Sequence, residues 1–160
     1  MTTETAPDTA PKQAWLPPRW FIRSAWVVHR AIYNVTGGNR GLKIPTDDQW
    51  GIMRLHSLGR RSGAERVAIL SYLEDGGDLV TMAMNGWADA EPAWWLNLQA
   101  SPDTTVDLSG GSRAVRARRA DPDERRRLWA RIATYDKDLE SYASRRSRET
   151  AVVILSPRPD

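Results

Sequence analysis

The chain has 160 residues, 41% of them apolar, which is the usual size of one domain and enough to form a hydrophobic core. It has no cysteine and two histidines outside any metal-ligand pattern, which excludes disulfide frameworks, thiolate metal sites and cysteine nucleophiles, so no bound metal is expected. The formal net charge is +3, and basic clusters at residues 12–43 and 113–127 would attract anions such as phosphates, anionic lipid or nucleic acid.

The N-terminal region divides into two parts. Residues 1–18 are rich in Thr, Ala and Pro and predict a disordered or extended arm, which leaves residues 19–160 as a single domain. Residues 19–35 predict a helix, because apolar residues cover most of its wheel and two glycines follow as a stop. A narrow stripe on this helix is basic and consists of Arg19, Arg23 and Arg30. The helix would either pack on the rest of the domain or bring the chain to an anionic membrane surface, and both alternatives stay open.

The sequence shows no signal for export or for crossing a membrane. No apolar run approaches the roughly 20 residues that span a bilayer, and the first residues lack the basic start and apolar core of a signal peptide. We therefore expect a cytoplasmic protein, with peripheral attachment to the inner face of the plasma membrane if the helix binds lipid.

The remainder of the chain alternates short apolar runs with Gly-rich turns, which is typical of antiparallel strands. Six such runs lie at residues 52–57, 65–73, 79–84, 104–108, 113–119 and 150–155. A helix is expected over residues 92–100, with Pro92 at its first position. Another opens at the acidic residues 121–124 and runs through Ile132, with an extension toward Tyr142. These elements predict an α+β protein, and the meander of strands favours a barrel.

One turn carries a distinctive chemistry, Gly59-Arg60-Arg61-Ser62-Gly63. Its glycines let the chain bend sharply and expose backbone amides. Its arginines and serine supply donors that suit phosphate oxygens, and Arg66 on the next strand could reach the same anion. The alternative is an ordinary hairpin turn with solvated charges.

A second segment places a strand end, a Gly turn and a helix start together, at residues 82–87 and 91–97. Backbone amides at such a junction can bind an anion or a polar ring edge. Trp94 or Trp95 could face a flat ring while the other packs in the core, and core packing of both is the alternative. Asn97 is expected to bond to the neighbouring loop and hold it.

Taken together, these motifs resemble the deazaflavin-dependent nitroreductase family over about residues 50–157. The matching residues, in order, are Leu55-His56-Ser57-Leu58-Gly59-Arg60-Arg61-Ser62-Gly63, Arg66, Asn85-Gly86, Pro92-Ala93-Trp94-Trp95-Leu96-Asn97-Leu98 and Ser101-Pro102. The resemblance implies a split β-barrel like that of FMN-binding pyridoxamine-phosphate-oxidase relatives, with an N-terminal helix and two further helices. It also implies an actinobacterial origin and coenzyme F420, a deazaflavin with a phosphate and an oligoglutamate tail, in preference to FMN.

The resemblance assigns cofactor contacts to three groups of residues. The phosphate would be bound by Gly59, Arg60, Arg61, Ser62, Gly63 and Arg66. The deazaflavin would lie against Met82, Met84, Asn85 and Gly86. The pocket would be completed by Pro92, Ala93, Trp94 and Asn97.

The expected activity is hydride transfer from reduced F420 to a small planar electron-poor acceptor such as a quinone, enone or nitroaromatic. Tyr135 and Tyr142 are the candidate catalytic residues, as proton donors or substrate-orienting groups. One alternative is a non-enzymatic carrier of F420, lipid or fatty acid with the same barrel. Nucleic-acid binding is disfavoured, because the arginines of residues 113–119 alternate with Ala and Val instead of aromatics.

Overall fold

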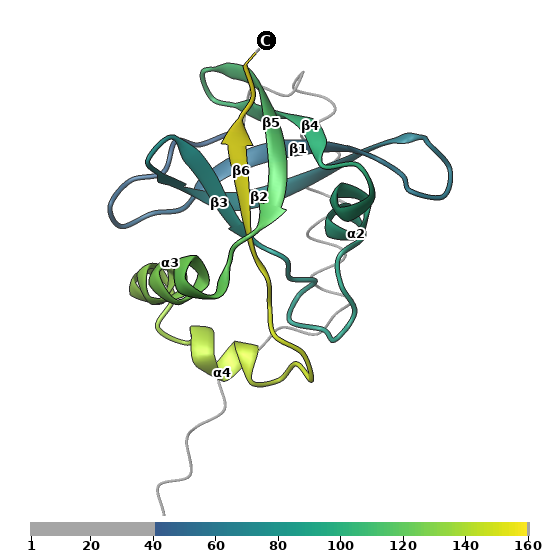
Figure 1. Cartoon of the computed structure of the whole chain (residues 1–160). Helices are drawn as coiled ribbons and strands as arrows, with labels where there is room; N and C mark the ends of the chain where they lie inside the picture. The colour runs from purple at the N-terminus through teal and green to yellow at the C-terminus, as the bar shows by residue number, and fades with distance from the viewer. Residues whose placement is uncertain (1–40, 160) are drawn as a thin grey trace, which may run out of the picture.

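The structure is a computed structural model that describes residues 41–159, so the predicted arm and the predicted helix 19–35 lie outside the described residues. The elements follow in the order β1 (Gly51–Leu58), β2 (Glu65–Asp75), β3 (Asp78–Met82), α2 (Ala93–Ala100), β4 (Asp103–Leu108), β5 (Gly111–Arg119), α3 (Pro122–Tyr135), α4 (Leu139–Ala143) and β6 (Val152–Pro157). In Figure 1, α3 and α4 lie together below the strands, and α2 lies apart from them, to the right of the strands.

The six strands form a closed barrel in the order β1-β2-β3-β6-β5-β4, and every pair is antiparallel. The ring closes through a short contact between β1 and β4, in which Arg54 opposes Asp107 and Leu55 opposes Val106. The predicted α+β class and antiparallel barrel of about six strands are confirmed.

The barrel is split along one side of β2. β2 pairs with β1 over residues 65–72, but with β3 only over residues 73–75. Beyond that pairing the Thr81 hydroxyl donates to the Ser71 carbonyl oxygen at 2.8 Å, so a side chain takes the place of a ladder bond. The first two thirds of β2 therefore have an edge that β3 does not cover, and a cavity can form there.

Two buried clusters stabilise this arrangement. The first fills the barrel with inward residues such as Met53 and Leu55 of β1, which are buried alternately along the strand, and continues to Trp94 and Trp95 of α2. The second lies between the barrel and the α3–α4 pair and includes Leu128 and other apolar residues of both layers. The barrel is therefore packed on its inside and against the α3–α4 pair.

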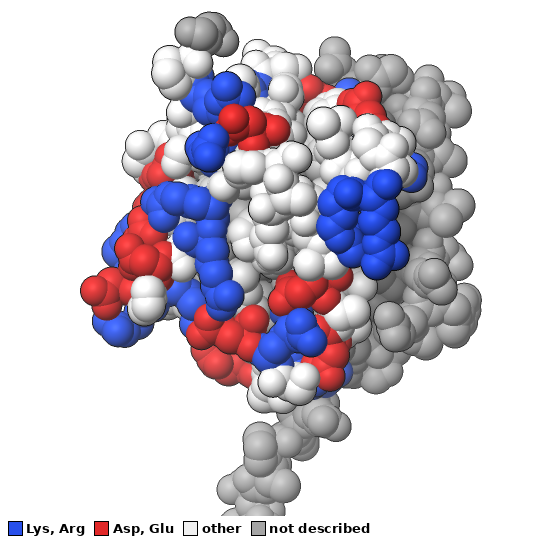
Figure 2. All heavy atoms as spheres, turned by 45° about the vertical axis from the view of Figure 1, so that its right-hand side comes forward, with Lys and Arg blue, Asp and Glu red and all other residues white. Residues whose placement is uncertain are grey.

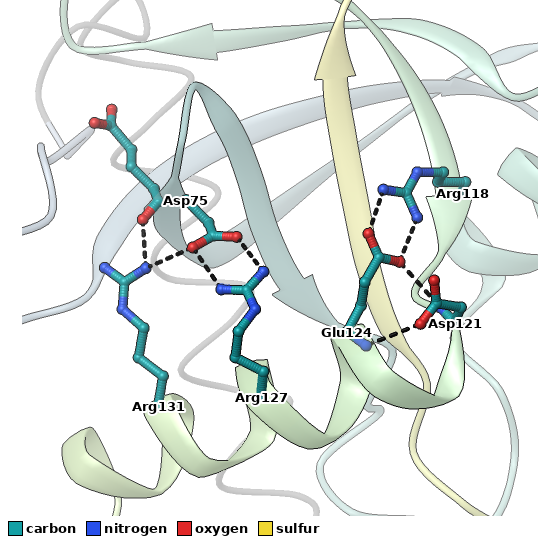
Figure 3. A network of polar contacts seen from close by, with 7 residues as sticks. Asp75, Arg118, Asp121, Glu124, Arg127 and Arg131 are labelled. Carbon is teal, nitrogen blue, oxygen red and sulfur yellow. Dashed lines mark hydrogen bonds and ion pairs between the residues drawn. The ribbon is translucent and has the colours of Figure 1, made fainter.

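Ion pairs attach α3 to the barrel. Figure 3 shows Asp75, at the β2–β3 turn, accepting from Arg127 at 2.8 Å and 3.0 Å and from Arg131 at 3.3 Å. At the start of α3, Glu124 accepts two bonds from Arg118 of β5 while Asp121 caps the helix.

Several element boundaries differ from the sequence prediction, most by one or two residues. α3 ends at Tyr135 and α4 is a separate helix, so α2, α3 and α4 are three helices instead of the two expected. The break occurs because the Asp136 side chain accepts from the Asp138 backbone N–H at 3.0 Å, which competes with continued helix. β3 ends at Met82, not Met84, and β6 begins at Val152, not at residue 150. No helix within residues 41–159 is long and apolar enough to cross a membrane.

Candidate active site

A cavity of about 1210 Å³ opens where β2 and β3 separate. Its lining includes all the predicted cofactor-binding residues except Gly63: Gly59, Arg60, Arg61, Ser62, Arg66, Met82, Met84, Asn85, Gly86, Pro92, Ala93, Trp94 and Asn97. They come from two regions of the sequence: the β1–β2 turn with the start of β2, and the end of β3 with the strand-end loop after it (residues 83–92) and the start of α2.

The β1–β2 turn is closed by its own backbone. The Gly59 N–H donates to the Ala64 carbonyl at 2.8 Å, and the Gly63 N–H donates to the Gly59 carbonyl at 2.7 Å. Gly63 has φ +66°, a left-handed conformation that favours glycine. A Cβ on Gly59 would stand 2.7 Å from the Ser62 hydroxyl oxygen. Gly63 therefore shapes the turn without lining the cavity.

Three arginines lie in this turn or just after it. Arg60, Arg61 and Arg66 are exposed and form no ion pair with any carboxylate of residues 41–159. Figure 2, which turns the β1–β2 side of Figure 1 toward the viewer, shows a compact group of basic side chains there. Guanidinium groups that find no carboxylate within residues 41–159 have donors that suit phosphate oxygens.

Asn97 fastens this turn to α2. Its side chain is buried, its Oδ1 accepts from the Arg60 backbone N–H at 3.1 Å, and its Nδ2 donates to the Ser57 hydroxyl at 3.3 Å. The two bonds use a donor and an acceptor of the amide, so the turn and the helix are held in a fixed relation.

The rest of the cavity wall is apolar and aromatic. Val67, Ile69 and Leu70 of β2 and Met82 of β3 are among the lining residues, together with Trp50, Trp87 and Trp94. Trp95 is not part of the lining and packs in the barrel core, with its ring centroid 6.2 Å from that of Trp94. The cavity thus joins a cationic turn to a pocket suited to a flat apolar ring.

Comparison with known proteins identifies the family. A family model described as F420H(2)-dependent quinone reductase matches residues 26–157. An F420H(2)-dependent quinone reductase of Mycobacterium tuberculosis is 31% identical over 147 residues, which cover 88% of this chain and 97% of that protein. The chain belongs to the F420H(2)-dependent quinone reductase family. Membership makes the chain an oxidoreductase and coenzyme F420 its cofactor, and it confirms the resemblance seen in the sequence.

Solved structures share the fold. An F420-H2 dependent reductase has a TM-score of 0.59 and 24% identity, over 66% of this chain and 93% of that one. A Listeria innocua protein assigned as a pyridoxamine 5′-phosphate oxidase has a TM-score of 0.50 and 18% identity, over 68% and 84% of the two chains. The predicted relation to this split-barrel fold is confirmed.

The residues of this quinone reductase family member fit F420. The unpaired arginines supply donors for a phosphate, and a Gly at position 86, with φ +57°, lets the backbone approach a ring closely. Apolar walls of β2 and Trp94 would exclude water from a planar heterocycle. Residues 41–159 contain no cluster of His, Asp or Glu that could hold a metal ion.

The structure does not place the two predicted catalytic tyrosines in the cavity lining. The Tyr135 hydroxyl donates to the Thr46 carbonyl at 3.2 Å, and its ring centroid is 5.5 Å from that of Trp50. The Tyr142 ring is stacked on Trp87, with centroids 5.8 Å apart and planes at 27°. Each tyrosine therefore supports a tryptophan that lines the cavity.

Sequence analysis missed several residues that line the cavity: Trp50, Ser57, Val67, Ala68, Ile69, Leu70, Ser71, Thr81, Trp87 and Asp136. On β2 the apolar side chains that face the cavity read the same as side chains that face a core. Trp87 followed the Gly86 turn that was singled out, so its neighbourhood was a usable signal. Asp136 is brought to the cavity by the break after α3, which the sequence prediction did not include.

His56 lies in a polar cluster of β1, β2 and β4, outside the cavity lining. Its Nδ1 is 2.7 Å from Glu65 Oε1 and its Nε2 is 2.9 Å from Asp107 Oδ2, while Arg54 donates to Asp107 at 2.6 Å. Burial lowers the pKa of His56, but the bonds to the two carboxylates outweigh it and leave the pKa above 6.5. Burial raises the pKa of Asp107, but donors from Ser112, His56 and Arg54 lower it to about 2.

Proposed function

We propose that this chain transfers a hydride from reduced F420 to a small planar electron-poor acceptor, with quinones as the main class and enones and nitroaromatics as the wider range. The observation that carries the proposal is the single cavity that joins unpaired arginines to an apolar, tryptophan-lined pocket. A phosphate-bearing planar cofactor needs both ends of such a site.

The chain's own residues would bind and orient the cofactor. Arg60, Arg61, Ser62 and Arg66 would hold the phosphate, with Gly59 and Gly63 shaping their turn. Met82, Met84, Asn85 and Gly86 would lie along the ring, and Pro92, Ala93, Trp94 and Asn97 would complete the pocket. When bound, reduced F420 supplies a hydride from a ring carbon. The apolar wall of β2 would then exclude water and seat a flat acceptor against that ring.

In this proposal Tyr135 and Tyr142 act indirectly: each packs against a tryptophan of the cavity lining, Trp50 and Trp87 respectively, and fixes its position. Neither tyrosine lines the cavity, and the Tyr135 hydroxyl donates a hydrogen bond to the backbone carbonyl of Thr46. A direct proton donation by either tyrosine is therefore the less supported role.

The deciding experiment measures binding and turnover on one preparation. F420 and FMN are each titrated while cofactor fluorescence is followed, and reduced F420 is then mixed anaerobically with a naphthoquinone. We expect F420 to bind more tightly than FMN and to be reoxidised only when the quinone is present. Binding without reoxidation by any acceptor would favour a carrier, and tighter binding of FMN would contradict the cofactor assignment.

We also propose that the chain is cytoplasmic and that residues 19–35 bring it to an anionic membrane surface. The support is the sequence of that segment, with a basic stripe and a wide apolar face that includes Trp20, Phe21 and Ile22. An apolar quinone acceptor would be found in the same membrane.

A further inference from the structure

The strand-end loop is held from outside the cavity by one buried side chain, Arg146, which follows α4. The Arg146 side chain has no exposed surface and does not line the cavity. Taking a guanidinium out of water is unfavourable unless its charge and its donors find partners. The partners of Arg146 therefore indicate its role.

These partners lie at both ends of the loop. Nη1 donates to the Ala83 carbonyl oxygen at 3.1 Å and to the Thr150 hydroxyl at 2.8 Å. Nη2 lies 3.5 Å from the Asp89 carbonyl oxygen and 3.6 Å from Glu91 Oε1. One planar group thus joins the first residue of the loop, its far end and the approach to β6. A lysine could keep the charge, but its single nitrogen could not span the same partners.

The loop needs such support because its tip is strained. Gly86 and Trp87 have φ values of +57° and +60°, and a tryptophan rarely adopts this left-handed conformation. Within the loop, the Ala88 N–H donates to Asn85 at 3.1 Å. A strained conformation persists when the surrounding structure holds it, and here Arg146 holds both ends.

We propose that Arg146 is a positioning residue for the cofactor. By fixing Ala83 and the Asp89–Glu91 end, it sets Met84, Asn85 and Gly86 at the cavity wall. This inference rests on the proposed function and deepens it, because Arg146 acts on F420 through the loop and does not touch the cavity. Glu91 supplies the counter-charge for the buried guanidinium, through its Oε1 at 3.6 Å.

The test compares Arg146→Lys and Arg146→Met with the same two changes at Arg148, an exposed arginine two residues further on. Hydrogen–deuterium exchange of residues 83–91 is measured without cofactor, with β1 and β5 as internal references, and F420 affinity is measured by fluorescence. Both Arg146 variants should speed exchange in the loop but not in β1 or β5. They should raise the F420 dissociation constant at least about fivefold, whereas the Arg148 variants leave it within about twofold.

If Arg146→Met does not fold, Arg146→Lys and Glu91→Gln, each close in shape to the natural residue, still decide the question. Unchanged loop exchange, or exchange raised equally throughout the barrel, would overturn the positioning role. So would an unchanged F420 affinity in Arg146→Lys when the natural chain binds F420 normally. Failure of the natural chain itself to bind F420 would instead overturn the proposed function.

Discussion

Arginines in this chain serve two purposes that their surroundings separate. Arg116, Arg118 and Arg127 each meet a carboxylate at 2.6–2.8 Å, so their charge is already matched. Arg60 and Arg61 have no such carboxylate within residues 41–159 and stand at the cavity mouth. A phosphate would therefore gain more from Arg60 and Arg61 than from any of the matched arginines.

Changing Arg60 and Arg61 together to Ala should weaken F420 binding at least about fivefold, because hydrogen bonds to charged groups each contribute about 1.5–3 kcal/mol and solvent exposure here reduces that figure. Fluorescence titration at low and high salt measures the effect, and the natural chain should show the steeper salt dependence. The control is Arg116→Ala with Arg126→Ala, which removes the same charge from two arginines already paired with Asp103 and Asp123. Equal weakening in both doubles would mean that net charge, not the turn, attracts the cofactor.

At the scale of elements, the polar cluster where β1 meets β4 should make the stability of the fold depend on pH. His56 of β1 lies between Glu65 of β2 and Asp107 of β4. Its folded pKa is above 6.5, so its contribution to stability is complete below pH 6.5 and is lost as the pH rises through the folded value. Asp107 acts in the opposite direction: its contribution is present above 3.8 and is lost as the pH falls toward about 2.

His56→Gln should therefore cost most stability near pH 6 and progressively less toward about pH 8.5, as the natural imidazole loses its proton. Urea unfolding of both proteins at the two pH values gives the difference in unfolding free energy. Both proteins keep His29, so its titration cancels from the comparison. A difference that grew with pH would show that neutral, not protonated, His56 is the form that the carboxylates stabilise.

α4 contributes to the cavity through an aromatic contact. Tyr142 stacks on Trp87, and an Arg145 guanidinium lies 5.5 Å from the centre of the tyrosine ring. Tyr142→Phe keeps the ring and should leave turnover within about twofold, whereas Tyr142→Leu should lower it by about two- to tenfold, the range expected for one aromatic pair. Steady-state kinetics with a quinone measures both. If Tyr142→Phe lowered turnover as much as Tyr142→Leu, the Tyr142 hydroxyl would be needed for activity, as expected of a proton donor.

The elements were predictable where the signal was local. The Gly–Arg turn, the Pro92 helix start and the period of the strands each depend on neighbours in the sequence, so the barrel followed from local patterns. The candidate cofactor residues came from the resemblance to a family, and most of them line one cavity. The end of α3 was not predictable, because the apolar pattern continues beyond it. The helix stops where the Asp136 side chain accepts a hydrogen bond from the Asp138 backbone N–H. For the same reason Tyr142 lies on the separate helix α4, whereas Tyr135 is the last residue of α3.

At the scale of the whole molecule, the cavity exists because strand pairing stops early. β2 is long enough to pair with β3 along its length, yet the pairing covers residues 73–75. The strand-end loop beyond that pairing contacts Arg146 and Tyr142, which come from a segment about 60 residues further along the chain. Such long-range contacts leave no periodic signal, which is why the wall formed by Val67–Ser71 was not predicted.

The whole chain is also the scale at which residues 19–35 can be tested. Their basic stripe and apolar face would suit an anionic bilayer, where each basic residue near the surface contributes about 1 kcal/mol. Anionic vesicles should therefore sediment the full chain at low salt, and high salt should release part of it. Neutralising Arg19, Arg23 and Arg30 together to Gln should abolish this binding without changing F420 affinity. The same change at Arg116, Arg126 and Arg158, which pair with Asp103 or Asp123, should leave sedimentation nearly unchanged. If the natural chain stays in solution with anionic vesicles at low salt, this segment does not bind membrane and belongs to the fold of the protein.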